Sequence, residues 1–130
     1  MPLVRIDLRR GKPPDYRKAI CDGVYRAMRE TFNVPDEDRF IVVNEHDDED
    51  LTFSRKFLGI ERGQGFVMIQ LTVSNTRSRD QKKALFARIV ELLSENPGVR
   101  PQDVMINLIE VKTEDWSFGN GIAQYVADQN

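Results

Sequence analysis

The sequence predicts a single α/β (α+β) domain, residues 1–130, in which two β-α-β units form a four-stranded mixed sheet with two helices on one face. The first observation is that the order strand, helix, strand occurs twice within 130 residues. The second is that the two halves match at an offset of 65 residues, which aligns Asp38 with Asp103. We therefore interpret residues 2–45 and 66–111 as an internal repeat.

The first unit has the residue spacing that each of its three elements requires. Residues 2–8 alternate apolar and charged side chains, as a half-buried strand does. Residues 14–32 place apolar side chains three and four positions apart, which indicates an amphipathic helix that begins at Pro14 and ends before Pro35. Residues 40–43 are aromatic and β-branched, and they predict the second strand.

The second unit repeats this order. Residues 65–73 are apolar at almost every position and predict a central strand. Residues 79–95 have helical spacing that ends before Pro97, and residues 103–111 alternate as a strand. A right-handed crossover makes the two strands of each unit parallel and puts the helix on one face of the sheet.

Two segments lie outside the repeated units. Residues 46–64 form a polar connection, and its histidine, His46, stands in the acidic run NEHDDED, which we interpret as a solvated loop. Residues 112–130 carry aromatic side chains between turn residues and are too apolar for a free tail. We expect this tail to fold over the body of the domain or over a neighbouring subunit.

The predicted arrangement leaves one face of the sheet without a cover. Both helices lie on the same side, although the strands are rich in apolar residues. A sheet face of this kind usually packs against another layer. We therefore expect the sheets of several copies to pack together, and a symmetric ring would bury the open face of every copy.

Composition argues against several classes of protein. The net charge is −2 at pH 7, and acidic residues outnumber basic ones, which argues against nucleic acid and anionic membranes as partners. No run of about 18 apolar residues is present, so no membrane-spanning helix is expected. A single cysteine, Cys21, and a single histidine, His46, exclude an internal disulfide and a multi-histidine metal site. A lone cysteine also fits the reducing cytoplasm, where we expect the protein.

The position of Pro2 raises a functional question. Proline has no amide hydrogen for a sheet ladder and is tolerated in a strand mainly at the first residue. If Met1 is removed, the ring nitrogen of Pro2 becomes a free secondary amine at the edge of a sheet, and such an amine can act as a catalyst. The alternative is a strand that simply begins with proline.

Five stretches of the chain resemble the tautomerase superfamily. They are PLVRIDL at the start, VPDEDRF at 34–40, LGIER at 58–62, TRSRDQKK at 76–83 and DWSFGNGIAQY at 115–125. In this order and spacing they resemble the malonate semialdehyde decarboxylase family and its tautomerase relatives with an N-terminal proline. The resemblance covers nearly the whole chain and implies a homotrimer that acts on a small oxo acid.

The resemblance also implies roles for individual residues. Pro2 would be the catalytic amine, Asp38 would hydrogen-bond near it or activate a water molecule, and Arg77 would hold the carboxylate of the substrate. In the family an arginine precedes the position of Arg77, and here that position is Asn75, while Arg79 appears just downstream. We therefore predict that Asn75 and Arg79 contribute to substrate binding.

Trp116 and Phe118 match an aromatic wall that the family places beside the proline. Such a wall and the charge of Arg77 lower the pKa of the Pro2 amine, whereas Asp38 raises it. A low pKa makes the amine a general base for enol-keto tautomerisation. A high pKa makes it an acid that polarises a carbonyl for decarboxylation or hydration. The amine could also form an iminium, which is an electron sink. The sequence leaves these routes open, and none of them needs a metal or an organic cofactor.

Each candidate residue also has a structural interpretation. Asp38 could serve only its helix-strand turn, as Asp103 does in the second unit, and Trp116 and Phe118 could be core or subunit contacts. Arg77 stands just before a helix, where a cation is unfavourable for the helix dipole, so a functional role is favoured there. The competing hypothesis for the whole chain is a trimeric binding or signalling module without catalysis.

Overall fold

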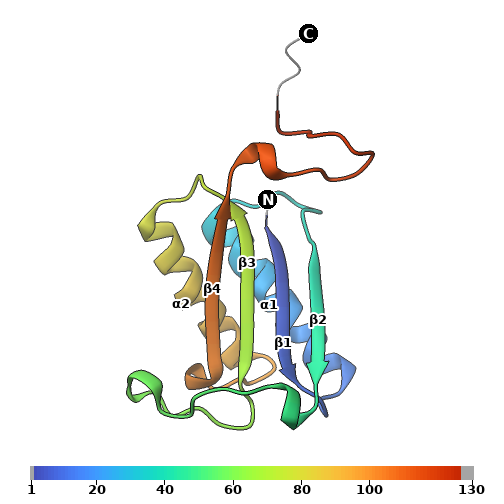
Figure 1. Cartoon of the computed structure of the whole chain (residues 1–130). Helices are drawn as coiled ribbons and strands as arrows, with labels where there is room; N and C mark the ends of the chain where they lie inside the picture. The colour runs from blue at the N-terminus through green and yellow to red at the C-terminus, as the bar shows by residue number, and fades with distance from the viewer. Residues whose placement is uncertain (1, 127–130) are drawn as a thin grey trace.

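The computed structural model describes residues 2–126 and has two layers, a four-stranded sheet and two helices on one of its faces (Figure 1). The strand order is β2-β1-β3-β4; β1 is parallel to β2, β3 is parallel to β4, and the central pair β1-β3 is antiparallel. In chain order the elements are β1 (Leu3–Arg9), α1 (Pro14–Phe32), β2 (Ile41–His46), β3 (Val67–Ser74), α2 (Arg79–Glu95) and β4 (Val104–Val111). The predicted mixed sheet of two β-α-β units is confirmed.

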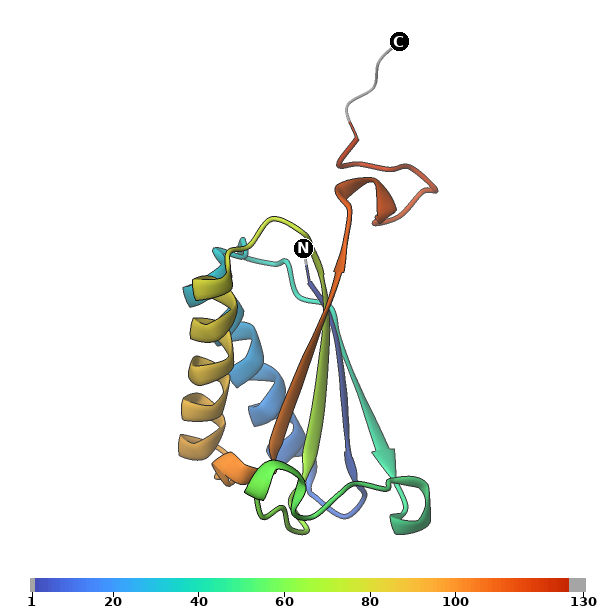
Figure 2. The ribbon, with the colours of Figure 1, turned by 60° about the vertical axis from the view of Figure 1, so that its left-hand side comes forward.

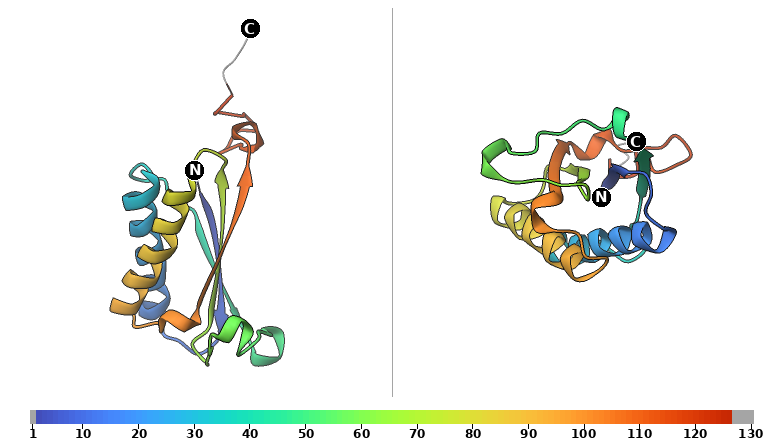
Figure 3. Two further views of the ribbon diagram at one scale, coloured as in Figure 1. Left: turned by 90° about the vertical axis from the view of Figure 1, so that its left-hand side faces the viewer. Right: turned by 90° about the horizontal axis from the view of Figure 1, so that it is seen from below.

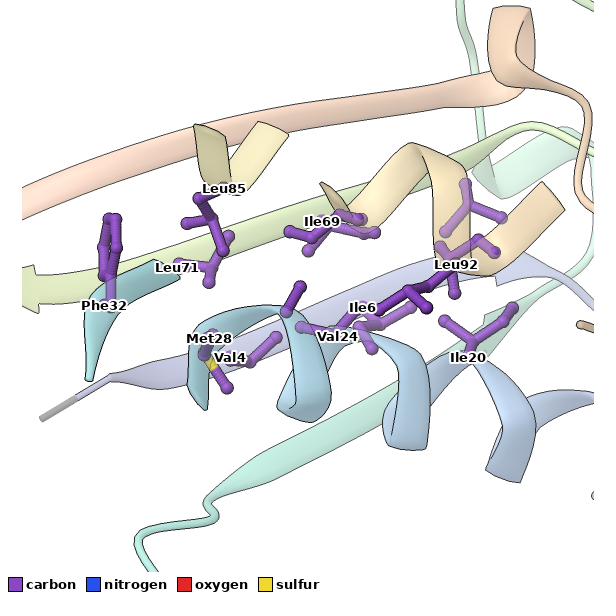
Figure 4. Packing of buried hydrophobic residues seen from close by; sticks show 14 of the residues in the cluster. Val4, Ile6, Ile20, Val24, Met28, Phe32, Ile69, Leu71, Leu85 and Leu92 are labelled. Atoms are coloured by element: carbon purple, nitrogen blue, oxygen red, sulfur yellow. The ribbon is translucent and has the colours of Figure 1, made fainter. Parts of the chain in front are cut away.

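The core lies between the sheet and the helices (Figures 2 and 4). Alternate residues of the central strands, such as Ile6 and Ile69, point into it and are at most 1% exposed. Val24 of α1 and Leu85 of α2 are fully buried in the same apolar cluster. The apolar residues that alternate along the strands therefore pack against the apolar faces of α1 and α2 in a single core.

The opposite face of the sheet carries no helix (Figure 3). It presents apolar side chains that are well exposed in the single chain, including Met105 and Ile109 of β4, which are 47% and 40% exposed. The connection between β2 and β3 adds Phe57 and Leu58, which are 63% and 79% exposed. We call this surface the open face. In the described part of the chain, neither helix is long and apolar enough to cross a membrane.

The largest boundary difference from the sequence-based expectation is at the end of the second strand, and the other strand ends differ by at most two residues. The second strand does not end at residue 43 but continues to His46, which was expected in a loop. Its parallel pairing with β1 extends to the pair Arg9 and His46, and His46 Nε2 lies 2.7 Å from Asp7 Oδ1. A partner strand and a side-chain contact thus outweigh the polar composition of this segment.

The two helices begin and end as predicted. Each starts with a recognisable signal: α1 has Pro14 in its first turn, and α2 has a capping box in which Ser78 and Gln81 bond each other's backbone N–H groups. Because β1 is antiparallel to β3, the start of β1 lies beside the ends of β3 and β4 and near the end of α1 (Figure 1). We call this the Pro2 end of the sheet.

Candidate active site

Pro2 lines a hollow at the Pro2 end of the sheet. It directly precedes β1 and is itself buried. The hollow has a volume of about 250 Å³ and is mostly apolar; its lining residues are Pro2, Leu3, Phe40, Trp116, Ser117 and Phe118. The predicted removal of Met1 concerns a residue outside the described part of the chain.

Asp38 stands in the turn between α1 and β2, two residues before Phe40. The Asp38 N–H bonds the carbonyl of Pro35 at 3.2 Å, and the Phe40 carbonyl accepts the N–H of Val4 at 2.9 Å, which ties the turn to the start of β1. The Oδ1 atom of Asp38 is buried, and no described residue donates a hydrogen bond to it. Burial raises the pKa of Asp38, and the nearby Arg77 guanidinium opposes this.

Arg77 lies between β3 and α2, and its side chain reaches the end of α1. It donates a hydrogen bond to the Phe32 carbonyl at 3.0 Å, and its guanidinium lies 5.0 Å from the centre of the Phe32 ring. The last carbonyls of a helix lack intrahelical donors and carry negative partial charge. Arg77 is therefore well placed against α1, although it is unfavourable next to the start of α2.

Trp116 and Phe118 follow β4 and form a wall of the hollow. Trp116 Nε1 donates to Ser74 Oγ at 3.0 Å, which fastens the tail to the end of β3. The Trp116 and Phe118 rings are stacked with centroids 5.5 Å apart, and Tyr125 meets Phe118 edge-on at 4.8 Å. Figure 1 shows the tail running beyond the Pro2 end of the sheet, and Tyr125 is 46% exposed. The expectation that the tail folds over the body is therefore met at Trp116, and packing over a neighbouring subunit stays a prediction.

Tyr125 is a site candidate that sequence reasoning missed. Its pKa is raised mainly by burial and further by the negative charge of Asp38, while Arg77 opposes the shift. Tyr125 therefore lies within electrostatic reach of both predicted polar residues. A third aromatic residue in the stretch DWSFGNGIAQY is the sequence signal for Tyr125, whereas the resemblance points only to Trp116 and Phe118.

One side chain gives the tail its compact shape. Gln124 Oε1 accepts the backbone N–H of Phe118, and Gln124 Nε2 donates to the carbonyl of Gly119, both at 2.9 Å. These two bonds close the segment between Phe118 and Tyr125 into a loop. The edge-on contact of the two aromatic rings follows from this closure.

Asn75 and Arg79 lie at the same end of the molecule but are exposed. Asn75 follows β3 and is tied through its backbone N–H to the Val111 carbonyl at 2.8 Å. Arg79 is the first residue of α2. This end of the sheet thus brings together an apolar wall, a carboxylate with one buried oxygen and a guanidinium. Among the described residues, no group of three His, Cys, Asp or Glu side chains could hold a metal ion.

Comparison with protein families gives this arrangement a context. Two models described as "Tautomerase enzyme" match the chain, one over residues 38–119 and the other over residues 2–57. The chain belongs to the tautomerase family. A relative from Bacillus subtilis (strain 168), "Probable tautomerase YusQ", is 35% identical over 126 residues, which cover 97% of this chain and 99% of the relative.

Two solved structures are similar to this tautomerase-family chain. FG41 malonate semialdehyde decarboxylase inhibited by 3-bromopropiolate is 37% identical with a TM-score of 0.89, over 95% of this chain and 93% of that one. A malonate semialdehyde decarboxylase described as having decarboxylase and hydratase activities is 31% identical with a TM-score of 0.88, over 95% of both chains.

Proposed function

We propose that this chain is a cofactor-free enzyme that uses the free amine of Pro2, after removal of Met1, on small oxo acids. The observation that carries the proposal is the buried Oδ1 of Asp38, which lacks a donor among the described residues, at the same end of the sheet as an apolar hollow lined by Pro2. Buried polar groups in native proteins are nearly always paired, so an unpaired one calls for a functional reason. Support also comes from membership of the tautomerase family.

The primary activity in this proposal is enol-keto tautomerisation. A free N-terminal amine titrates at a pKa of about 7.7–8.0 in water. The apolar wall of Trp116 and Phe118 disfavours the ammonium form and lowers this pKa, so that the amine can take a proton from the substrate. The same amine then returns the proton to the neighbouring carbon, and no net proton is consumed.

Arg77 and Asp38 have separate roles in this scheme. The Arg77 guanidinium binds the carboxylate of the oxo acid, for which its planar donor geometry is suited. Asp38 hydrogen-bonds the amine or a water molecule and so sets the fraction of Pro2 that is protonated. Asn75 and Arg79, at the rim, supply further donors to the substrate.

A second candidate activity is decarboxylation or hydration of a 3-oxo acid. The observation in its favour is the similarity to malonate semialdehyde decarboxylase over 95% of the chain. In this route Arg77 holds the carboxylate, and the bond from the carboxylate carbon to the neighbouring carbon breaks as carbon dioxide leaves. Its electron pair moves toward the carbonyl oxygen that protonated Pro2 polarises, and the enolate so formed takes up a proton at carbon. The apolar wall favours the step in which the charge leaves the carboxylate and spreads over the enolate. The protonation state of Pro2 at working pH decides between the two activities.

The proposal includes assembly as a homotrimer in the cytoplasm. The open face, with Met105 and Ile109 exposed, is the surface that a ring of sheets would bury. The alternative function is a trimeric binding or signalling module that keeps the fold but has no physiological catalysis. This alternative gives no reason for a buried, unpaired Asp38 oxygen.

The test compares the wild-type protein with Pro2→Ala and with Pro101→Ala, a proline at the opposite end of the sheet. Intact mass should show loss of one methionine, and light scattering should give three times the chain mass of 15.0 kDa. Phenylenolpyruvate ketonisation and malonate semialdehyde decarboxylation are then assayed. We expect Pro2→Ala to lower kcat by about 10²-fold or more and Pro101→Ala to leave it unchanged. Turnover that is absent, or equal in all three proteins, would favour the binding module.

A further inference from the structure

Three side chains on one face of α1 contact the residues on both sides of Asp38. Asp22, Tyr25 and Arg29 are spaced three and four positions apart, which places them on one face of the helix. All three contact the turn that carries Asp38, and none of these contacts involves the Asp38 side chain.

The hydroxyl of Tyr25 makes the central contact. It accepts the backbone N–H of Glu37 at 3.2 Å and lies 3.3 Å from Asp36 Oδ1, to which it donates. Glu37 has a φ of 69°, in the left-handed region that side chains other than glycine rarely adopt. A backbone of this kind persists only where its surroundings hold it, and the Tyr25 hydroxyl supplies that support from another element.

Two cations hold the flanks of the same turn. Arg39, which follows Asp38, pairs with Asp22, and its guanidinium lies 4.8 Å from the centre of the Tyr25 ring. Arg29 donates to Asp36 at 3.3 Å. The residues before and after Asp38 are thus fixed to α1. The carboxylate itself remains unpaired at its buried oxygen.

We propose that Tyr25 is a positioning residue for Asp38. Its hydroxyl fixes the backbone at Glu37, and this keeps the Oδ1 atom of Asp38 buried near Arg77. Without the hydroxyl, the turn relaxes and the carboxylate gains access to solvent. An effect of Tyr25 on catalysis rests on the proposed function of Asp38. The effect of Tyr25 on the position of Asp38 does not depend on that function.

The test is Tyr25→Phe, which removes the hydroxyl and keeps the ring that Arg39 covers. The matched control is Tyr16→Phe, because Tyr16 is also on α1 and has a cation, Lys12 Nζ, 4.8 Å from its ring centre. The two readouts that do not depend on activity are amide hydrogen exchange at Glu37 and a carbon-13 NMR titration of the Asp38 carboxyl. The third readout is kcat and KM in the tautomerase assay.

In Tyr25→Phe we expect exchange at Glu37 to be about tenfold faster, since one hydrogen bond is lost. We expect the pKa of Asp38 to fall toward its ordinary value of about 3.9, because burial is what raises it. Tyr16→Phe should match the wild type in both. Unchanged exchange and an unchanged Asp38 pKa in Tyr25→Phe would overturn the proposal.

The kinetic readout separates the two claims. If the wild type shows turnover that depends on Pro2, Tyr25→Phe should lower kcat about tenfold with little change in KM, and its pH profile should shift with the Asp38 pKa. A wild type without turnover would count against the proposed function alone. The NMR and exchange measurements would still decide the role of Tyr25.

Discussion

The two ends of the sheet carry equivalent aspartates of the repeated unit, and these two side chains differ in their hydrogen bonding. Asp38 and Asp103 occupy equivalent positions at the helix-strand turns of their units. Asp103 is 2% exposed, accepts the Gly63 N–H at 2.7 Å and lies 3.7 Å from the Arg100 guanidinium. Asp38 has a buried oxygen without a donor. Asp103 is thus bonded within the fold, whereas the Oδ1 atom of Asp38 receives no hydrogen bond from the described residues.

The chain path explains this difference. Val67 is the equivalent of Pro2, and it is preceded by Gly65 and Phe66, so its nitrogen is a peptide amide. This preceding chain fills the space beside Asp103: a Cβ added at Gly65 would come within 3.3 Å of Asp103 Oδ2. At the Pro2 end, the residue directly before β1 is Pro2. In the proposed function, removal of Met1 makes the Pro2 nitrogen a free amine that can act on a substrate in the hollow.

The largest expected contrast is in activity. Asp38→Ala should lower kcat by about 10²-fold or more, as expected for loss of a group that governs proton transfer at Pro2. Asp103→Ala, assayed below its unfolding temperature, should keep kcat within about threefold of the wild type, because it lies at the opposite end of the sheet. Steady-state assays of the two variants check this. Equal losses in both would show that the ends are not functionally distinct.

The same two substitutions should change the free energy of unfolding in opposite directions relative to the wild type. Asp103→Ala leaves the Gly63 N–H without its acceptor and removes the carboxylate that lies 3.7 Å from the Arg100 guanidinium, so the free energy of unfolding should fall by about 2–3 kcal/mol. Asp38→Ala removes an unpaired buried acceptor and should raise that free energy by about 1 kcal/mol at pH 7. Urea unfolding measures both. A destabilised Asp38→Ala would mean that a donor outside the described residues, such as the free Pro2 amine or a water molecule, stabilises the Asp38 carboxylate in the folded protein.

The contrast also shows what the sequence could predict. The period of residues 14–32 and 79–95 predicted both helices, because burial of an apolar stripe is a local pattern. The resemblance pointed to Asp38, Arg77, Trp116 and Phe118 before the structure placed them at one end of the sheet. Those four residues belong to three separate segments, and no local pattern records how the antiparallel pairing of β1 and β3 brings such segments together.

What the sequence could not predict depended on contacts between distant segments. From the sequence, Arg77 is unfavourable for the dipole of the helix that follows it. In the structure its partners are the carbonyl and the ring of Phe32, at the end of the other helix. His46 was assigned to a loop from the acidic residues around it, but Asp7 and strand pairing hold it in β2. In both cases a long-range partner outweighed the local pattern.

The smallest expected effect is the pH dependence of the stability difference between the wild type and Asp38→Ala. Because burial raises the pKa of Asp38, the folded wild type binds more protons than the unfolded chain between the ordinary pKa of about 3.9 and the raised value. The stability of the wild type therefore falls as pH rises through that window. The advantage of Asp38→Ala should accordingly be full at pH 7 and largely vanish near pH 4. Because the side chain is only partly buried, the change should be below about 1 kcal/mol. Urea unfolding of both proteins at the two pH values measures it, and an advantage that grows on acidification would mean that the Asp38 carboxylate is stabilised in the fold, as a paired Asp103 would be.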